Sequence, residues 1–167
     1  MGCEDFVVRI TSEIGCDALK STLATMPGVH QDERLGRTYG ESYWRYEDPD
    51  HIIEVEVAPS HHGSTTSIAF AVCHPATIDD VFTTFVIDLA NRVEGEVVIA
   101  EDVESDDFVA QSTFVIPHGT ALRRSILSCI PKKRAMWHVE FGNTEARTSC
   151  RDALIQFVVE PNSVRKS

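Results

Sequence analysis

Several features that mark whole classes of protein are missing from this sequence of 167 residues. No apolar run approaches the ~18 residues that a membrane-spanning helix needs, so we expect no membrane partner. The five cysteines include no C-x-x-C pair, which excludes a zinc ribbon and a disulfide framework and favours the reducing cytosol. The first residues lack the basic and apolar segments of a secretory signal. Together these absences predict a cytoplasmic protein.

Positive charge is also scarce. Lys and Arg number 15 against 26 Asp and Glu, which gives a formal net charge of −11. Residues 1–117 carry 22 of the acids and 6 of the bases, whereas residues 118–167 carry 4 acids and 9 bases. Because sequence-independent DNA binding needs clustered cations, we expect no nucleic-acid partner. The acidic part of the chain instead favours a protein partner with a basic surface.

The residues that are present predict one globular domain over residues 1–167. Hydrophobic residues make up 43% and charged residues 25%, close to average globular usage. Alternating apolar residues predict strands, at 6–10, 43–47, 52–58, 67–73, 97–100, 109–116 and 136–141. Three- and four-residue spacing predicts helices, at 16–26, 77–94, 120–130 and 149–159, the third stopping at Pro131. We therefore predict an α+β fold, an antiparallel sheet with helices on one face.

The strongest helical pattern starts at Thr77. Thr77 and Asp80 have the spacing of a capping box, and Gly95 marks the end of the helix. An apolar stripe runs along the segment between them. The stripe predicts that Phe82, Phe85 and Leu89 are nearly fully buried.

Four short blocks occur twice in the same order, within residues 6–93 and 114–160, on either side of an acidic connector at 101–107. The blocks pair 6–8 with 114–116, 18–27 with 121–131, 43–47 with 136–140 and 80–88 with 152–160. The only two Trp residues, Trp44 and Trp137, fall in the third pair and should occupy equivalent strand positions. Two interpretations follow: a divergent duplication of a ferredoxin-like β-α-β unit, or chance similarity between amphipathic patterns.

Two His residues at strand ends form the first candidate site. If the second and third strands of the central meander share a buried face, the natural register pairs Val55 with Phe70. That register places His51 opposite His74 at one end of the sheet. Two imidazoles alone make a weak metal site, so the competing interpretation is a pair of polar residues satisfied at a sheet edge. We expect no metal and no other cofactor.

The second candidate site consists of His62-Gly63-Ser64 and His118-Gly119-Thr120. Two His-x-Ser/Thr motifs in a duplicated α+β chain resemble the 2H phosphoesterases, on these six positions alone. The resemblance implies that His62 and His118 act as general acid and base while Ser64 and Thr120 hold the phosphate. The context departs from that family, whose motifs lie on strands at symmetry-related places. The competing interpretation is that the two motifs form a turn and a helix cap.

The function predicted from these patterns is a non-enzymatic interaction module that binds a basic protein surface. In size, fold class and charge the chain is similar to small acidic inhibitor and toxin-immunity proteins. A small phosphoesterase using His62 and His118 is one alternative. A small-molecule sensor that binds between the two halves, beside Trp44, Tyr46 and Trp137, is another. The sequence leaves the oligomeric state open.

Overall fold

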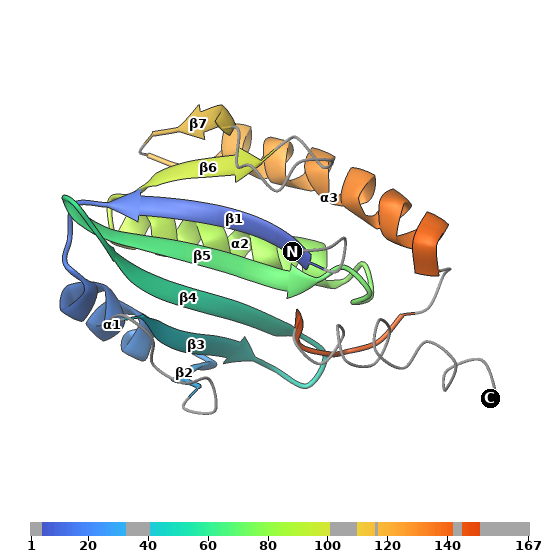
Figure 1. Cartoon of the computed structure of the whole chain (residues 1–167), viewed down its shortest axis with the longest axis horizontal. Coiled ribbons are helices and arrows are strands. Elements are labelled where there is room, and N and C mark those ends of the chain that lie inside the picture. Colours follow the sequence, from blue (N-terminus) through green and yellow to red (C-terminus); the bar gives the residue numbers. More distant parts are fainter. Residues whose placement is uncertain (1–4, 33–40, 101–109, 116, 142–144, 151–167) are drawn as a thin grey trace.

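The computed structural model describes residues 5–32, 41–100, 110–115, 117–141 and 145–150. Its strands are β1 (Asp5–Ser12), β2 (Val29–Gln31), β3 (Ser42–Glu47), β4 (Ile52–Ser60), β5 (Gly63–Ala71), β6 (Glu96–Ala100) and β7 (Ala110–Phe114). Its helices are α1 (Cys16–Thr25), α2 (Ile78–Arg92) and α3 (Thr120–Phe141). The strands form one sheet in the order β2-β3-β4-β5-β1-β6-β7, and every neighbouring pair is antiparallel (Figure 1). The predicted α+β class is confirmed.

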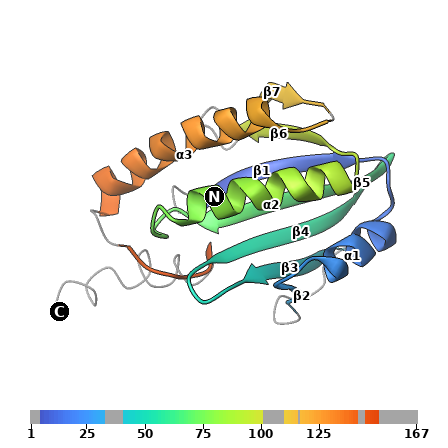
Figure 2. The same cartoon turned by 180° about the vertical axis from the view of Figure 1, so that it is seen from behind.

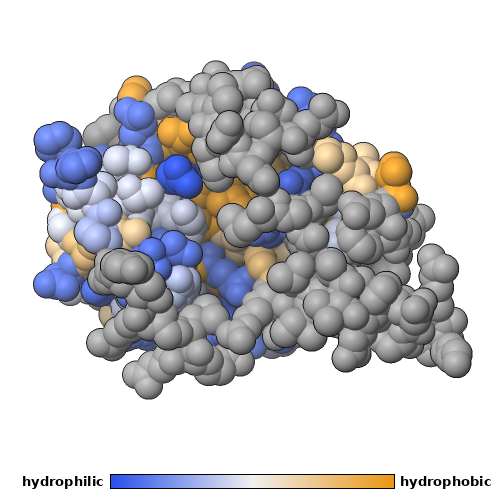
Figure 3. Space-filling view, in the orientation of Figure 1, coloured by the Kyte–Doolittle hydropathy of each residue, from blue (hydrophilic) through white to orange (hydrophobic). Residues whose placement is uncertain are grey.

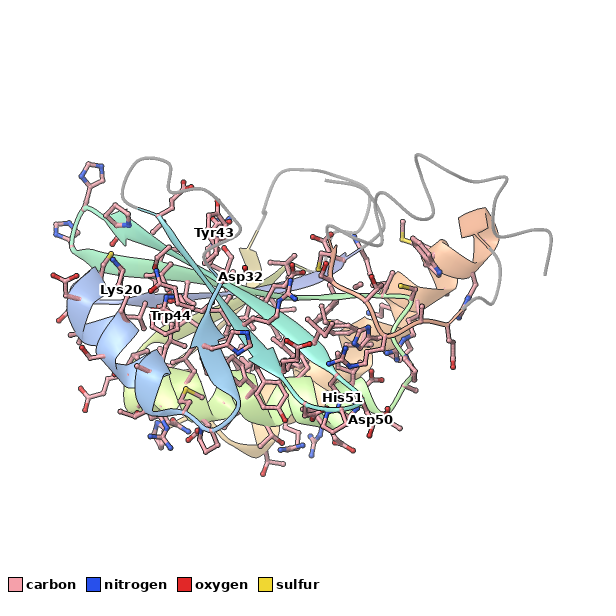
Figure 4. All side chains as sticks on the ribbon, turned by 90° about the horizontal axis from the view of Figure 1, so that it is seen from below. Lys20, Asp32, Tyr43, Trp44, Asp50 and His51 are labelled. Atoms are coloured by element: carbon pink, nitrogen blue, oxygen red, sulfur yellow. The ribbon has the colours of Figure 1, made fainter. Side chains whose placement is uncertain are left out.

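The three helices cover one face of the sheet (Figures 2 and 4). Side chains along β1 alternate between buried and partly exposed, as a strand with one covered face requires. The rings of Phe6 on β1, Phe70 on β5 and Phe82 on α2 pack against one another, with centroids 4.8–5.7 Å apart. Phe82 and Leu89 are fully buried and Phe85 is 7% exposed, so the predicted core face of α2 is confirmed.

The register between β4 and β5 differs from the predicted one by two residues. Val55 pairs with Ile68 and not with Phe70. The ladder continues to Ser60 and Gly63, which leaves a turn of only two residues. A tight turn fixes the register of a hairpin, whereas a slip of two residues keeps the same side chains on the buried face. The apolar pattern therefore identified the correct face but could not select the register.

Helix α3 corrects a second prediction. The helix was expected to stop at Pro131 and to be followed by a strand at 136–141, but it runs unbroken from Thr120 to Phe141. Proline removes one helical hydrogen bond, and tertiary contacts of the following turn offset that loss. Trp137 is fully buried, and the Arg134 guanidinium lies 2.6 Å from the Asp79 carboxylate of α2. These contacts hold the second half of α3 against the body of the protein.

The strand equivalence of the two Trp residues is therefore wrong, since Trp44 lies on β3 and Trp137 on α3. Strand β2 is an addition, since no strand was predicted at Val29–Gln31. The acidic connector at 101–107, the fourth repeat block at 152–160 and all but the start of the helix at 149–159 lie outside the described residues. The duplication as a whole stays a prediction. No helix in the described part of the chain has both the length and the apolar character needed to cross a bilayer.

Candidate functional site

Four polar residues lie together at the end of the sheet where the β3–β4 turn meets the start of α2. We call Asp48, His51, His74 and Thr77 the histidine cluster. Figure 4 shows His51 at the start of β4, beside α2. The turn is closed by Asp48, whose backbone N–H donates to the His51 carbonyl at 3.1 Å. Its carboxylate accepts the backbone N–H groups of Asp50 at 2.8 Å and His51 at 2.7 Å, an Asx turn that only a short acidic or amide side chain makes.

The Asp48 carboxylate is held in its charged form. Burial by itself would raise its pKa, but hydrogen bonds from the His51 ring, the Tyr46 hydroxyl and two backbone N–H groups outweigh burial and lower the pKa well below its ordinary value. The Tyr46 hydroxyl lies 2.8 Å from Asp48 Oδ2. Burial, followed by this hydrogen bond, raises the pKa of Tyr46 to about 12, so Tyr46 remains a neutral donor.

His51 joins this carboxylate to a hydroxyl. Its Nδ1 is 3.0 Å from both carboxylate oxygens of Asp48, and its Nε2 is 3.1 Å from Thr77 Oγ1. Because an ionised carboxylate can only accept, Nδ1 donates its proton to Asp48, and in the neutral imidazole Nε2 accepts from the Thr77 hydroxyl. The residue His51 is 8% exposed, whereas Thr77 is exposed. The result is a hydroxyl–imidazole–carboxylate array whose hydroxyl belongs to an exposed residue.

His74 has a structural role beside this array. It lies beyond the last residue of β5, where its Nε2 accepts the backbone N–H of Ile52 at 3.1 Å. Burial first, and then the nearby charges of His51, Arg147 and Arg134, lower the pKa of His74 to about 4. His74 is therefore neutral near pH 7 and supplies an acceptor to the first residue of β4.

The two His residues share one end of the sheet, but the predicted cross-strand pair is wrong, because the β4–β5 ladder ends before it reaches His74. Both ring nitrogens of His51 have partners, Asp48 and Thr77, and Nε2 of His74 accepts from Ile52. Within the ranges that the structure describes, no three His, Cys, Asp or Glu residues are grouped so as to hold a metal ion. The cluster is suited to moving a proton at Thr77.

Residues 145–150 close this end of the sheet from one side, the orange-red segment of Figure 1. Ala146 N–H donates to the Cys73 carbonyl at 2.8 Å, and Arg147 donates to the Asp48 carbonyl at 2.6 Å and to Glu47 at 2.9 Å. Arg147 lies 99 positions from Asp48 along the chain. No local sequence signal could have placed it here.

The first His-x-Ser/Thr motif lies at the opposite end of the sheet. His62 is exposed in the two-residue turn between β4 and β5. Ser64 is buried, and its hydroxyl donates to the Ile14 carbonyl at 2.8 Å. Gly63 between them has a φ of 153°, and a Cβ there would overlap the Ser12 carbonyl oxygen. The motif joins the hairpin to the β1–α1 turn.

The second motif joins the start of α3 to the end of α2. The His118 backbone N–H donates to Asn91 Oδ1 at 2.9 Å, and Asn91 Nδ2 donates to the His118 carbonyl at 3.1 Å. The His118 ring is buried, with Nε2 2.6 Å from the Gly95 carbonyl oxygen. Thr120 is exposed at the first position of α3. Ser64 and the His118 ring are thus engaged by separate backbone carbonyls, and their role in phosphoester chemistry stays a prediction.

The small-molecule sensor hypothesis rested on three aromatic residues, and each of them packs in its own way. Trp44 is 8% exposed and its indole N–H donates to the Ser42 hydroxyl at 3.2 Å. The ring of Tyr46 packs on Phe85 of α2, with centroids 5.8 Å apart. Trp137 is fully buried on α3. Each of the three is accounted for by packing.

Four exposed carboxylates gather where β1, α2 and β6 end or begin, and we call Glu13, Asp17, Glu94 and Glu96 the acidic end. The Ser12 hydroxyl donates to the Val93 carbonyl, and Thr11 pairs with Glu96 across β1 and β6, so these segments are neighbours. Hydrophilic residues gather at this end in Figure 3 (left). Among the described residues, Asp17 has an ion-pair partner, Lys20 at 3.8 Å, and the three glutamates have none.

Helix α2 separates the two ends, with Thr77 before its first turn and Glu94 after its last. A helix of its 15 residues is about 22 Å long at 1.5 Å per residue. No family model, curated protein or solved structure matches the chain, so its function has to be inferred from these two ends of the sheet.

Proposed function

We propose that the protein is a cytoplasmic interaction module, similar in kind to small acidic inhibitors and immunity proteins, whose acidic end binds a basic surface of a partner protein. The observation that carries this proposal is the placement of Glu13, Glu94 and Glu96. All three are exposed on neighbouring segments, and none forms an ion pair within the described part of the chain. Carboxylates arranged in this way are available to Lys and Arg side chains of another molecule.

Glu94 supports the proposal because the fold gains nothing from its side chain. Its φ is 49°, the left-handed conformation that favours glycine at the end of a helix. It also places a negative charge at the C-terminus of α2, where the helix dipole favours a positive charge. Both effects disfavour glutamate at this position. A binding role explains why a carboxylate stands here.

The nearby cations do not neutralise the three glutamates of the acidic end. Arg92, in the last turn of α2, is 2.9 Å from the Asp88 carboxylate, and Lys20 is paired with Asp17. The negative potential of the glutamates therefore extends into solvent, where it attracts a basic surface over about one Debye length, roughly 8 Å at physiological ionic strength. Contacts of this type govern encounter and orientation more than they contribute affinity.

The test compares two variants that lack the same number of negative charges. A pull-down from a lysate of the source organism, followed by mass spectrometry, identifies the partner, and titration calorimetry with the purified partner gives the dissociation constant. Glu13→Gln/Glu94→Gln/Glu96→Gln should weaken binding by about tenfold, since three exposed charge contacts together contribute roughly 1–2 kcal/mol.

The matched control is Asp50→Asn/Glu56→Gln/Glu145→Gln, which removes three exposed or partly exposed carboxylates elsewhere on the molecule, none of which forms an ion pair within the described residues. This variant has the same formal net charge as the first and should bind like the wild type. Equal weakening by both variants would mean that overall charge, and not the acidic end, attracts the partner. A partner that binds all three proteins equally would contradict the proposal.

A further inference from the structure

We propose that Thr77 is a site of covalent acylation, at which a small activated ester or thioester transfers its acyl group to the Thr77 hydroxyl with His51 as the base. Three features of the histidine cluster support this assignment: a hydroxyl that does not cap its helix, a buried imidazole oriented to accept its proton, and a local charge balance that tolerates an anion. The site lies at the end of α2 remote from the acidic end, so the assignment does not rest on the proposed function.

The Thr77 hydroxyl is available because the helix does not need it. A threonine before the first turn of a helix ordinarily accepts a backbone N–H of that turn. Thr77 makes no such bond, so the predicted capping box is wrong. The N–H groups of Ile78 and Asp79 donate instead to the carbonyls of Pro75 and Ala76, at 3.1 Å each. Thr77 is an exposed residue, and its hydroxyl has His51 Nε2 as its partner, at 3.1 Å.

The imidazole of His51 is fixed in the orientation that accepts this proton. Asp48 binds Nδ1 with both oxygens at 3.0 Å and so leaves the lone pair of Nε2 directed at Thr77. Asp48 is itself held by Tyr46 and by two backbone N–H groups. A hydroxyl, an imidazole and an oriented carboxylate in series are the arrangement that activates serine and threonine nucleophiles. Here the base is buried and the nucleophile belongs to an exposed residue.

The surroundings of Thr77 tolerate the negative charge that forms on the carbonyl oxygen during acyl transfer. Thr77 stands at the N-terminus of α2, the positive end of the helix dipole. Asp79 and Asp80 in the first turn would oppose that charge. Asp79 is paired with Arg134 at 2.6 Å and Asp80 with Arg123 at 3.3 Å, so both carboxylates are compensated.

The chemical step conserves atoms and electrons without an additional reagent. Thr77 Oγ1 attacks the carbonyl carbon of the acyl donor, and its proton moves to His51 Nε2. The bond from that carbon to the ester oxygen or thioester sulfur then breaks, and the leaving atom takes the bonding electron pair and receives the proton from His51. The products are an ester on Thr77 and a free alcohol or thiol, one acyl group for each chain.

The experiment uses p-nitrophenyl acetate as the acyl donor and the chain of 167 residues. Release of p-nitrophenolate gives the rate, and mass spectrometry of proteolytic peptides locates the acetyl group. We expect one acetyl group on Thr77 in the wild type. Thr77→Val should lose it, and His51→Gln should slow its formation by roughly 100-fold, the usual contribution of a general base. Asp48→Asn, which acts through His51, should slow the reaction and change its pH dependence.

Two further variants separate a chemical effect from a loss of folding. Thr77→Ser keeps a hydroxyl and should still be acetylated. Thr22→Val removes an exposed hydroxyl of α1 that donates to the Ala18 carbonyl, and should leave acetylation of Thr77 unchanged. Circular dichroism confirms that each variant is folded. Acetylation confined to lysines or other residues, or acetylation of Thr77 that is as fast in folded His51→Gln as in the wild type, would overturn the assignment.

Discussion

At the scale of single residues, His74 links the stability of the fold to pH. Its neutral imidazole accepts the Ile52 N–H, and burial lowers its pKa to about 4 from an ordinary value of 6.5. Above pH 6.5 neither the folded nor the unfolded chain binds a proton at this residue, and the contribution of His74 to stability is fully present. As the pH falls from 6.5 to 4, the unfolded chain takes up a proton that the folded chain does not, so stability is lost.

We expect the free energy of unfolding to fall across this window, with a contribution from His74 of up to ~1.4 kcal/mol per pH unit. Urea denaturation of the wild type and of His74→Gln between pH 4 and pH 7 measures the difference between their slopes. The shallower slope should belong to His74→Gln. His62→Gln, a change at an exposed turn residue, is the control and should keep the slope of the wild type. Parallel slopes in wild type and His74→Gln would contradict the prediction.

The residues of the histidine cluster were only partly predictable. His51 and His74 could be identified because each lies next to an alternating apolar strand. A polar residue at such a position needs a hydrogen-bond partner at the edge of the sheet. The pairing of His51 with Thr77 joins positions 26 residues apart and depends on the path of the loop between β5 and α2. The sequence suggested a cap for Thr77, because threonine before an amphipathic helix usually serves as one. In the structure the Thr77 hydroxyl is paired with His51 and does not cap the helix.

At the scale of elements, one ion pair holds the second half of α3. Arg134 lies past Pro131, and its side chain is 13% exposed, with Nη1 donating to Asp79 at 2.7 Å and the guanidinium 5.8 Å from the centre of the Phe70 ring. We expect Arg134→Met to lower the free energy of unfolding by ~1–3 kcal/mol, since it leaves a partly buried carboxylate without its partner. Chemical denaturation measures the loss.

Lys132→Met supplies the matched control, because it makes the same kind of change on an exposed side of the same helix. Its free energy of unfolding should stay within about 0.5 kcal/mol of the wild type. If both variants lost the same amount, hydrophobic substitution on α3 and not the ion pair would be responsible.

The elements themselves were predicted where their local pattern was strong. The alternation in β1, β3, β4 and β6 and the apolar stripe of α2 each describe one buried face, and a periodic pattern determines which face is buried. The pattern failed at residues 136–141. Met136, Trp137 and Val139 fit a strand as well as a helix, and the choice was made by burial of Trp137 and by the contact of Arg134 with α2.

At the scale of the whole molecule, the fold separates two kinds of chemistry. The strands β4 and β5 and the helix α2 run between the two ends, so the histidine cluster and the acidic end stand at opposite limits of the same elements (Figures 1 and 2). A modification at Thr77 and a partner at Glu94 would therefore not compete for surface. The net charge could be calculated from the sequence, but the position of the acidic end could not be predicted. That end consists of residues 13–17 and 94–96, which are far apart in the sequence and are brought together by β1, α2 and β6.

Association with the basic partner should depend strongly on ionic strength. With a formal net charge of −11 and glutamates exposed at one end, long-range attraction should accelerate encounter at low salt. The Debye length falls from about 30 Å at 0.01 M salt to about 3 Å at 1 M, which screens that attraction. Stopped-flow measurement should therefore give an association rate constant that falls by at least about tenfold over this range, while the dissociation rate constant changes much less. In Glu13→Gln/Glu94→Gln/Glu96→Gln the fall should be smaller than in the matched Asp50→Asn/Glu56→Gln/Glu145→Gln variant. An association rate constant that does not change with ionic strength in any of the three proteins would show that electrostatic attraction does not accelerate binding.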